Sequence, residues 1–138
     1  MLKAIVLAGA LALASPAFAQ STGPDAVADT LFGLIRSGEI AKAYDGLGRG
    51  TVLDQKKLEL QNVANQTTAA LQIYGKVLDW ELMSEKKLSQ SYVARSYLLR
   101  TERGPIFFNL HLYRGAQGWT VLNIYFTDIL KNLTAMEP

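Results

Sequence analysis

Few side chains in this sequence are suited to acid–base chemistry. His111 is the single histidine, and histidine is the side chain that titrates near neutrality without any perturbation. It lies in the alternating apolar segment 106–114, which predicts a strand, and the alternation places it on the face opposite the aliphatic residues. This placement favours a surface or interface histidine over a general acid or base.

Asp79 and Glu81 form a second candidate pair. They lie two residues apart in a predicted strand and so share one face, while Leu78, Trp80 and Leu82 share the other. If the apolar face is buried, both carboxylates point to solvent, and nothing places them on opposite sides of a cleft as a glycosidase requires. The pattern favours structural roles, and we predict no catalytic residue.

The residue types that are missing exclude several other chemistries. The chain has no cysteine, which removes thiol nucleophiles, thiolate zinc sites and disulfides. A single histidine excludes a site built from several histidines of one chain. The sequence also lacks a GxSxG segment, a phosphate-binding glycine loop and a dinucleotide fingerprint. We therefore predict neither a metal site nor a cofactor.

The first residues have the three-part pattern of a secretion signal. Lys3 provides a charged start, residues 4–14 form a short apolar run, and Ala17-Phe18-Ala19 is a small-x-small cleavage site. The run is shorter than the roughly 20 apolar residues that span a bilayer. We expect cleavage after Ala19, a periplasmic or secreted protein, and no membrane anchor after cleavage.

The rest of the chain, residues 20–138, has the length and composition of a single domain. Loss of the signal would remove Lys3 and lower the formal net charge from +2 to +1. Lys56-Lys57 and Lys86-Lys87 are isolated basic pairs and form no basic stretch. We therefore expect no nucleic-acid partner.

The first half of this domain shows helical periodicity. One helix is predicted to open at Pro24 and to end at Ser37-Gly38, and a second to span residues 39–47. A third, capped by Asp54, is predicted to end at Gly75. Its apolar stripe consists of Leu60, Ala64, Thr67, Leu71 and Tyr74.

The second half has the alternation of strands. Four are predicted, at about residues 76–84, 88–101, 106–114 and 119–129, with turns that include 85–87 and 115–118. Consecutive strands with short connections form an antiparallel meander. Helices followed by such a meander give an α+β fold, with the helices packed on a four-stranded sheet.

The last predicted hairpin separates two kinds of face. If Arg114 pairs with Gly118, Leu110 lies opposite Leu122, and one face is wholly apolar and covers the helices. The other face is aromatic and polar, unlike a merely solvated face. We predict that it forms a binding or self-association surface made of Phe107, Asn109, His111, Tyr113, Trp119, Asn123 and Tyr125.

Several occupants of that aromatic face stay open. Aromatic residues contribute strongly to protein interfaces, so a second copy of the chain or another exported protein would fit, and a sugar ring would stack on it. The C-terminal segment 130–136 is a further occupant. Leu130, Leu133 and Met136 recur there at helical spacing and must be buried against some surface.

The segment Leu34–Tyr44, with the sequence LIRSGEIAKAY, resembles the start of NTF2-like domains. In those domains a helix, a glycine, an acidic residue and an Ala-aromatic helix are common, and a long helix and a curved meander follow in a similar order. The chain is most similar to small exported bacterial members without an assigned activity. The resemblance implies a cone-shaped fold, a pocket between helices and sheet, and dimerisation through the outer sheet face.

Two functions of different classes follow from these observations. The leading one is an exported, non-catalytic binding or assembly domain that dimerises through the aromatic face or binds another exported protein. The alternative is an isomerase or dehydratase that acts on a small apolar ligand, in a pocket lined by Tyr44, Tyr74 and Trp80. NTF2-like enzymes of that kind use an inward-facing His or Asp, and neither motif matches this chain residue by residue.

Overall fold

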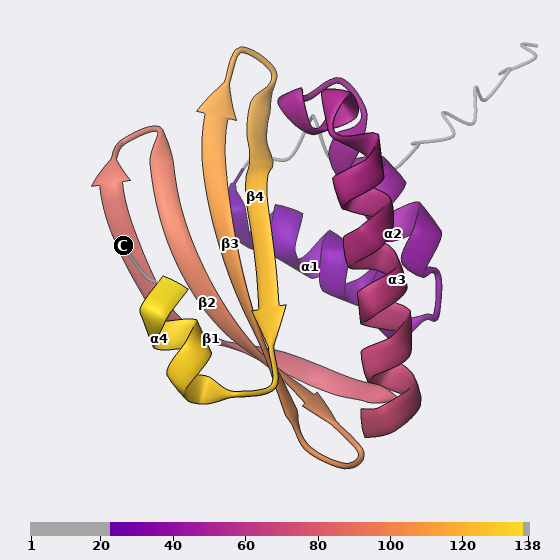
Figure 1. Ribbon diagram of the computed structural model, residues 1–138. Coiled ribbons are helices and arrows are strands. Elements are labelled where there is room, and N and C mark those ends of the chain that lie inside the picture. Colours follow the sequence, from indigo (N-terminus) through magenta and orange to yellow (C-terminus); the bar gives the residue numbers. More distant parts are fainter. Residues whose placement is uncertain (1–22, 137–138) are drawn as a thin grey trace, which may run out of the picture.

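The computed structural model describes residues 23–136, so the predicted signal lies outside the described residues (Figure 1). Helices precede a four-stranded antiparallel sheet, which confirms the predicted α+β class. No helix in this part of the chain has the length and hydropathy to cross a membrane. The elements are α1 (Pro24–Arg36), α2 (Ile40–Gly48), η2 (Val52–Gln55), α3 (Lys57–Tyr74), β1 (Val77–Ser89), β2 (Tyr92–Thr101), β3 (Pro105–Gly115), β4 (Gly118–Thr127) and α4 (Leu130–Met136).

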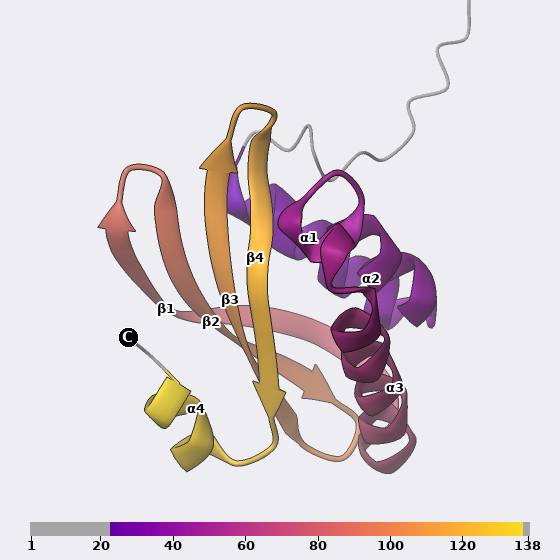
Figure 2. The same ribbon diagram turned by 45° about the horizontal axis from the view of Figure 1, so that its top comes forward.

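The sheet separates two sets of helices. Its strands follow the order β1-β2-β3-β4 and bend around α1, α2 and α3, whereas α4 lies on the opposite face (Figures 1 and 2). We call these the concave and the outer face. Helix α1 contacts β1 and β4, and α2 contacts both α1 and α3. The helical layers are therefore stacked on the sheet through α1.

A cluster of aromatic rings fixes α1 against the concave face. The ring of Phe32 lies 5.8 Å from that of Trp80, 5.1 Å from that of Tyr97 and 5.3 Å from that of Phe108, measured between centroids. All three pairs are tilted or edge-on, the arrangement that aromatic quadrupoles favour. Phe32 is fully buried, so it fills the centre of the interface between helix and sheet.

The start of the third helix differs from the prediction. Asp54 does not cap it but lies within the short 3-10 helix η2, which Thr51 caps by accepting a hydrogen bond from the amide of Leu53. Helix α3 then begins at Lys57 and ends at Tyr74. Gly75 terminates it, as predicted, with a φ of 87° that suits glycine. Its stripe is confirmed where it faces α2, because Leu60 and Thr67 are buried.

The predicted turn at Glu85-Lys86-Lys87 is wrong. Strand β1 continues to Ser89, and these residues pair with Arg95, Ala94 and Val93 of β2. These charged residues were mistaken for a turn because β1 is an edge strand, and its second half, residues 81–89, is exposed. An exposed edge strand needs no apolar alternation, and lysines there hinder pairing with other molecules.

The register of the last hairpin also differs from the prediction. Gly115, and not Arg114, pairs with Gly118, and the loop has two residues instead of three. Gly118 adopts a φ of 108°, which glycine tolerates without strain. Together with a bulge farther along β4, this register pairs Leu110 with Ile124 and not with Leu122.

A β-bulge in β4 changes which side chains share a face. It lies between the pairs Leu112–Val121 and His111–Asn123, where β4 contains one extra residue. Trp119 lies between the turn and the bulge, pairs with Arg114 because of the two-residue loop, and packs against the concave core next to the buried Val121. The predicted neighbourhood of Trp119 and Tyr113 on the outer face is therefore wrong.

Helix α4 covers part of the outer face. It contacts β3 and β4, and its Leu133 is only 1% exposed. Phe107 and Asn109, which point to that face from β3, are also buried. The C-terminal segment is thus confirmed as one occupant of the predicted aromatic face.

This packing predicts unequal effects of two leucine substitutions in α4. Leu133→Ala should lower the free energy of unfolding by roughly 2 kcal/mol or more, because it removes a fully buried side chain. Leu130→Ala should change it by less than about 0.5 kcal/mol, since Leu130 is largely exposed. Urea unfolding of both variants measures the difference, and equal effects would contradict the docking of α4 on the sheet.

Candidate functional site

The structure does not bring together the three residues predicted to line a pocket. Tyr44 is buried between α2 and α3, where its Oη lies 2.7 Å from Oγ1 of Thr67. The Thr67 hydroxyl donates to the carbonyl of Val63, so Tyr44 is the donor of the pair. Burial raises the pKa of Tyr44 well above its usual range, and the bond to Thr67 opposes this only in part. Tyr44 therefore joins two helices as a neutral phenol.

Tyr74 and Trp80 have other partners. Tyr74 Oη donates to Oδ2 of Asp128 at 2.6 Å, and this bond raises the pKa of Tyr74. Trp80 Nε1 donates to Oδ1 of Asp29 at 2.9 Å, and the guanidinium of Arg36 lies 4.9 Å from the centre of a Trp80 ring. Each of these side chains ties a helix to the sheet or to its last strand, which is a structural role.

The carboxylates singled out in the sequence lie on β1, at one edge of the sheet. Asp79 accepts two hydrogen bonds from Arg100, at 2.5 and 2.6 Å, and these bonds lower the pKa of Asp79. Glu81 is exposed on the same strand. Both carboxylates are accessible to solvent, but the opposite face is not buried as the prediction assumed, since Leu78 and Leu82 are each 48% exposed.

Sequence reasoning missed a charged cluster on the concave face. Arg95 is only 8% exposed, and its guanidinium donates to Asp25 at 2.5 Å, to Glu85 at 2.5 Å and to Tyr97 Oη at 3.0 Å. The signal was its position in β2, where alternate residues on either side, Val93 and Tyr97, are buried. Because two carboxylates already neutralise it, Arg95 is not an open anion site; it joins the first turn of α1 to β1 and β2.

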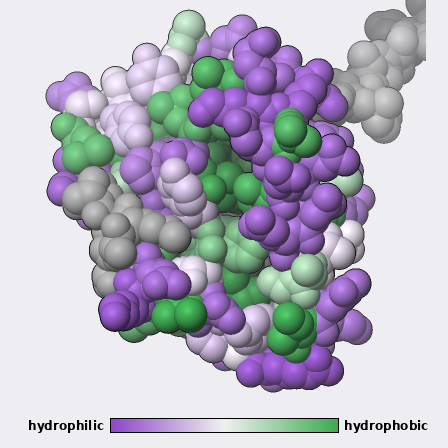
Figure 3. Space-filling model, in the orientation of Figure 1, coloured by the Kyte–Doolittle hydropathy of each residue, from purple (hydrophilic) through white to green (hydrophobic). Residues whose placement is uncertain are grey.

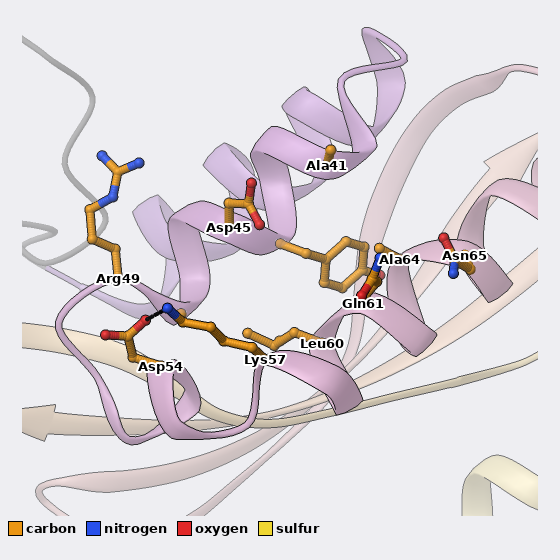
Figure 4. Close-up of a pocket in the computed structure, with 11 residues that line it drawn as sticks. Ala41, Asp45, Arg49, Asp54, Lys57, Leu60, Gln61, Ala64 and Asn65 are labelled. Atoms are coloured by element: carbon orange, nitrogen blue, oxygen red, sulfur yellow. Dashed lines mark ion pairs between the residues drawn. The ribbon is translucent and has the colours of Figure 1, made fainter.

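A polar groove runs between α2 and α3 (Figure 4). Its volume is about 600 Å³, with Tyr44 and Leu60 in its wall and charged residues around it. Figure 4 shows Arg49 directed away from the other lining residues, while Lys57 is engaged with Asp54 at 3.7 Å. The charged groups do not converge on one point, so this groove offers no built polar site.

A second groove, between α3 and β4, has a different character (Figure 3). Its volume is about 310 Å³, near the lower limit for small-molecule sites. Figure 3 shows a hollow with a hydrophobic floor between these elements. Leu53, Leu60 and Ile124 are buried members of its lining. We call it the α3–β4 groove; it is lined by Leu53, Lys56, Glu59, Leu60, Val63, Asn123, Ile124 and Tyr125.

The rim of the α3–β4 groove is polar and mixed in charge. Lys56 and Glu59 lie on the helical side. On the strand side, Asn123 Nδ2 donates to Tyr125 Oη at 3.0 Å, and Asn123 Oδ1 accepts from the amide of Ile124 at 3.0 Å. Two residues predicted for a binding surface, Asn123 and Tyr125, thus line a groove. An apolar floor with a few polar groups at its margin is typical of ligand sites.

Only part of the predicted aromatic face is exposed on the outer face of the sheet. His111 Nδ1 lies 2.7 Å from Tyr92 Oη, and their rings meet edge-on with centroids 5.7 Å apart. Tyr113 pairs with Tyr92 across the strands and is 42% exposed. We call Tyr92, His111 and Tyr113 the outer aromatic patch. It excludes Phe107 and Asn109, which are buried on the face that α4 covers, and Trp119, which lies on the concave side.

Comparisons with known proteins address the fold. A scan against protein-family models gave no match, and neither did a search of curated proteins. A crystal structure from Campylobacter jejuni, provisionally described as an NTF2-like transpeptidase, superposes with a TM-score of 0.56 and covers 72% of this chain and 97% of that one. The chain has an NTF2-like fold. The sequence identity is 15%, so the likeness concerns the fold and not the activity.

In this NTF2-like fold, aromatic packing fills the centre between α1 and the sheet. Phe32, Tyr97 and Phe108 are buried there and contact one another's rings through Phe32. The α3–β4 groove lies at the margin of this packing, and its lining contains no histidine, serine or cysteine. Among the described residues, no group of three or more His, Cys, Asp or Glu side chains is placed to hold a metal ion.

The environment of His111 predicts a pH dependence of stability. Burial lowers the pKa of His111 below its usual range, so the folded protein takes up a proton less readily than the unfolded chain. Stability should therefore fall as the pH drops below about 6.5, the pKa of an unperturbed histidine. Urea unfolding between pH 7.5 and 5.5 measures this loss. His111→Gln should reduce it, and an unchanged slope in that variant would contradict the assignment.

Proposed function

We propose that this NTF2-like chain is an exported, non-catalytic binding domain that holds an apolar group in the α3–β4 groove. The observation that supports this most directly is the floor of that groove, where core residues border an open cavity of about 310 Å³. Removing apolar surface from water contributes about 25 cal/mol per Å², so an apolar ligand would gain by covering this floor.

The ionisable groups of the groove support binding better than catalysis. Lys56, Glu59 and Tyr125 are all exposed on the rim, and none of them lies on the buried floor that would hold an apolar substrate. An isomerase or dehydratase needs an acid or base within hydrogen-bond reach of the reacting atom. The alternative of a small-molecule enzyme therefore receives less support from this groove than a binding role.

The description of the Campylobacter jejuni structure does not carry over to this chain. Transpeptidation by a covalent route requires an activated nucleophile such as serine or cysteine. This chain contains no cysteine, and the lining of the α3–β4 groove contains no serine. We therefore take from that protein the fold and not the reaction.

Export is part of the proposal and rests on the pattern of residues 1–19. Expression of the full chain in a bacterium should yield a periplasmic or secreted protein whose first residue is Gln20. Mass spectrometry of the recovered protein measures this end. Ala19→Tyr should block cleavage, because a large side chain does not fit the site, and an uncleaved wild-type chain would contradict the assignment.

Binding in the α3–β4 groove is testable with a small neutral probe. Titration with toluene, followed by methyl NMR, should shift the signals of Leu53, Leu60, Val63 and Ile124, because their side chains line the floor. The methyl signals of Ile73, an exposed residue of α3 outside the groove lining, should not shift.

A matched pair of variants checks the location of this site. Val63→Asp should abolish the toluene shifts by placing a charge at the floor, whereas Ile73→Asp should leave them unchanged. Absence of any shift in the wild-type groove near the solubility limit of toluene would overturn the proposal.

A second candidate function is assembly through the outer aromatic patch. Its support is the exposure of Tyr113 beside the Tyr92–His111 pair, on a face that α4 covers only in part. Exposed aromatic residues that also form hydrogen bonds are common at protein interfaces. A second copy of the chain or another exported protein would fit such a surface.

Analytical ultracentrifugation tests this second function. The wild type should form a dimer at high micromolar concentration, and Tyr113→Glu should convert it to a monomer. Gln117→Glu, in the exposed β3–β4 turn, adds the same charge and should leave the dimer intact. A monomeric wild type, or equal dissociation in both variants, would remove self-association through this patch.

A further inference from the structure

The outward edge of β4 is a feature that neither proposed function uses. Within residues 23–136, β4 pairs with β3 on one side and has no strand on its other side. Edge strands present backbone N–H and C=O groups that can pair with a further chain. Helix α3 lies on that open side, and the α3–β4 groove lies between the two elements (Figure 1).

One backbone group in the groove is satisfied by a substitute for a neighbouring strand. The amide of Ile124 donates to Oδ1 of Asn123 at 3.0 Å, and Asn123 Nδ2 donates to Tyr125 Oη at 3.0 Å. A side-chain amide offers a carbonyl acceptor and an N–H donor, as a peptide group does. Asn123 is exposed, so its amide can rotate away without disturbing the core.

We propose that the α3–β4 groove binds an extended, uncharged peptide segment, which adds to β4 as a fifth strand. A carbonyl of the peptide replaces the Asn123 amide at the N–H of Ile124, and one apolar side chain of the peptide covers Leu53 and Leu60. The inference rests on the proposed binding function of the groove. It extends that function by giving the class of ligand and the backbone contact that recognises it.

The charge of the rim favours a peptide over an anionic amphiphile. Lys56 and Glu59 contribute one charge of each sign, so the rim offers no surplus positive charge to a carboxylate. A peptide backbone is neutral and presents donors and acceptors in alternation, so one of its carbonyls suits the Ile124 N–H once the Asn123 amide is displaced. Strand addition gives affinity through backbone bonds and selectivity through alternate side chains.

The test uses the full mature chain and a capped hexapeptide that alternates leucine and threonine. In an NMR titration, the amide signals of Asn123, Ile124 and Tyr125 should shift, and cross-strand NOEs should connect the peptide backbone to β4. A second hexapeptide of the same sequence, N-methylated at alternate residues, should bind at least tenfold more weakly, because it has lost the donors of one edge. This comparison leaves the protein unchanged, so folding defects do not affect it.

Variants of the protein provide a second comparison. Asn123→Ala removes the side-chain amide that competes for the Ile124 N–H. It should tighten binding of the hexapeptide about fivefold, because one hydrogen bond contributes about 1 kcal/mol. Val63→Asp should abolish binding, whereas Ile73→Asp should not. A parallel titration with decanoate tests whether the groove binds an anionic amphiphile instead of a peptide.

Four results with the hexapeptides, decanoate and Asn123→Ala would overturn the inference. Two concern the ligands: equal affinity of the two hexapeptides, and shifts caused by decanoate but not by the hexapeptide. The third is weaker binding of the hexapeptide by Asn123→Ala. The fourth is aggregation of Asn123→Ala without peptide binding, which would show that Asn123 only prevents edge-to-edge association of the protein. Toluene binding without peptide binding would overturn this inference alone. Binding of neither probe would overturn the proposed function as well.

Discussion

The contact of Phe32 with the sheet determines the positions of the other two α-helices on the concave face, α2 and α3. Its ring meets Trp80 of β1, Tyr97 of β2 and Phe108 of β3, so one side chain of α1 is in contact with three strands. Helix α2 packs on α1, and α3 packs on α2, where the buried Tyr44–Thr67 hydrogen bond joins them. The position of α1 on the sheet therefore determines the distance between α3 and β4, and with it the width of the groove between them. The Phe32 ring therefore fills the space between α1 and the sheet, and the α3–β4 groove lies at the margin of that packing.

The buried Arg95 fixes the orientation of the same helix at a second point. It links Asp25 in the first turn of α1 to Glu85 of β1, about two turns of helix away from Phe32. Burial of a charge is costly unless it is paired, and removal of one partner costs more than the pair contributes. The cluster is therefore better understood as a constraint on orientation than as a large source of stability. Two attachment points, one aromatic and one ionic, prevent α1 from pivoting on the sheet.

Local periodicity was sufficient to predict the helices, the four strands and the α+β class, because each depends on neighbours in sequence. It failed where the structure departs from strict alternation. The consecutive apolar residues Val121-Leu122 contain the one signal of the bulge, since two adjacent apolar residues cannot both face the core of a regular strand. A prediction that assumed a three-residue loop and an unbroken ladder placed Trp119 on the wrong face. Leu60 was correctly placed on a buried stripe, but its proximity to Ile124 depends on the packing of α3 beside β4, for which the sequence has no local pattern.

The bulge also connects the fold to the candidate site. Without the extra residue, the strict alternation of β4 would give Val121 and Asn123 the same face, and either the core would lose Val121 or it would have to accept an unpaired amide. With it, Val121 is buried against Leu112 while Asn123 stays exposed beside the groove. The strand side of the polar rim, formed by Asn123 and Tyr125, therefore depends on one irregular residue in an edge strand. Because the bulge leaves the strand order unchanged, it alters the rim of the groove in this chain without altering the topology of the sheet.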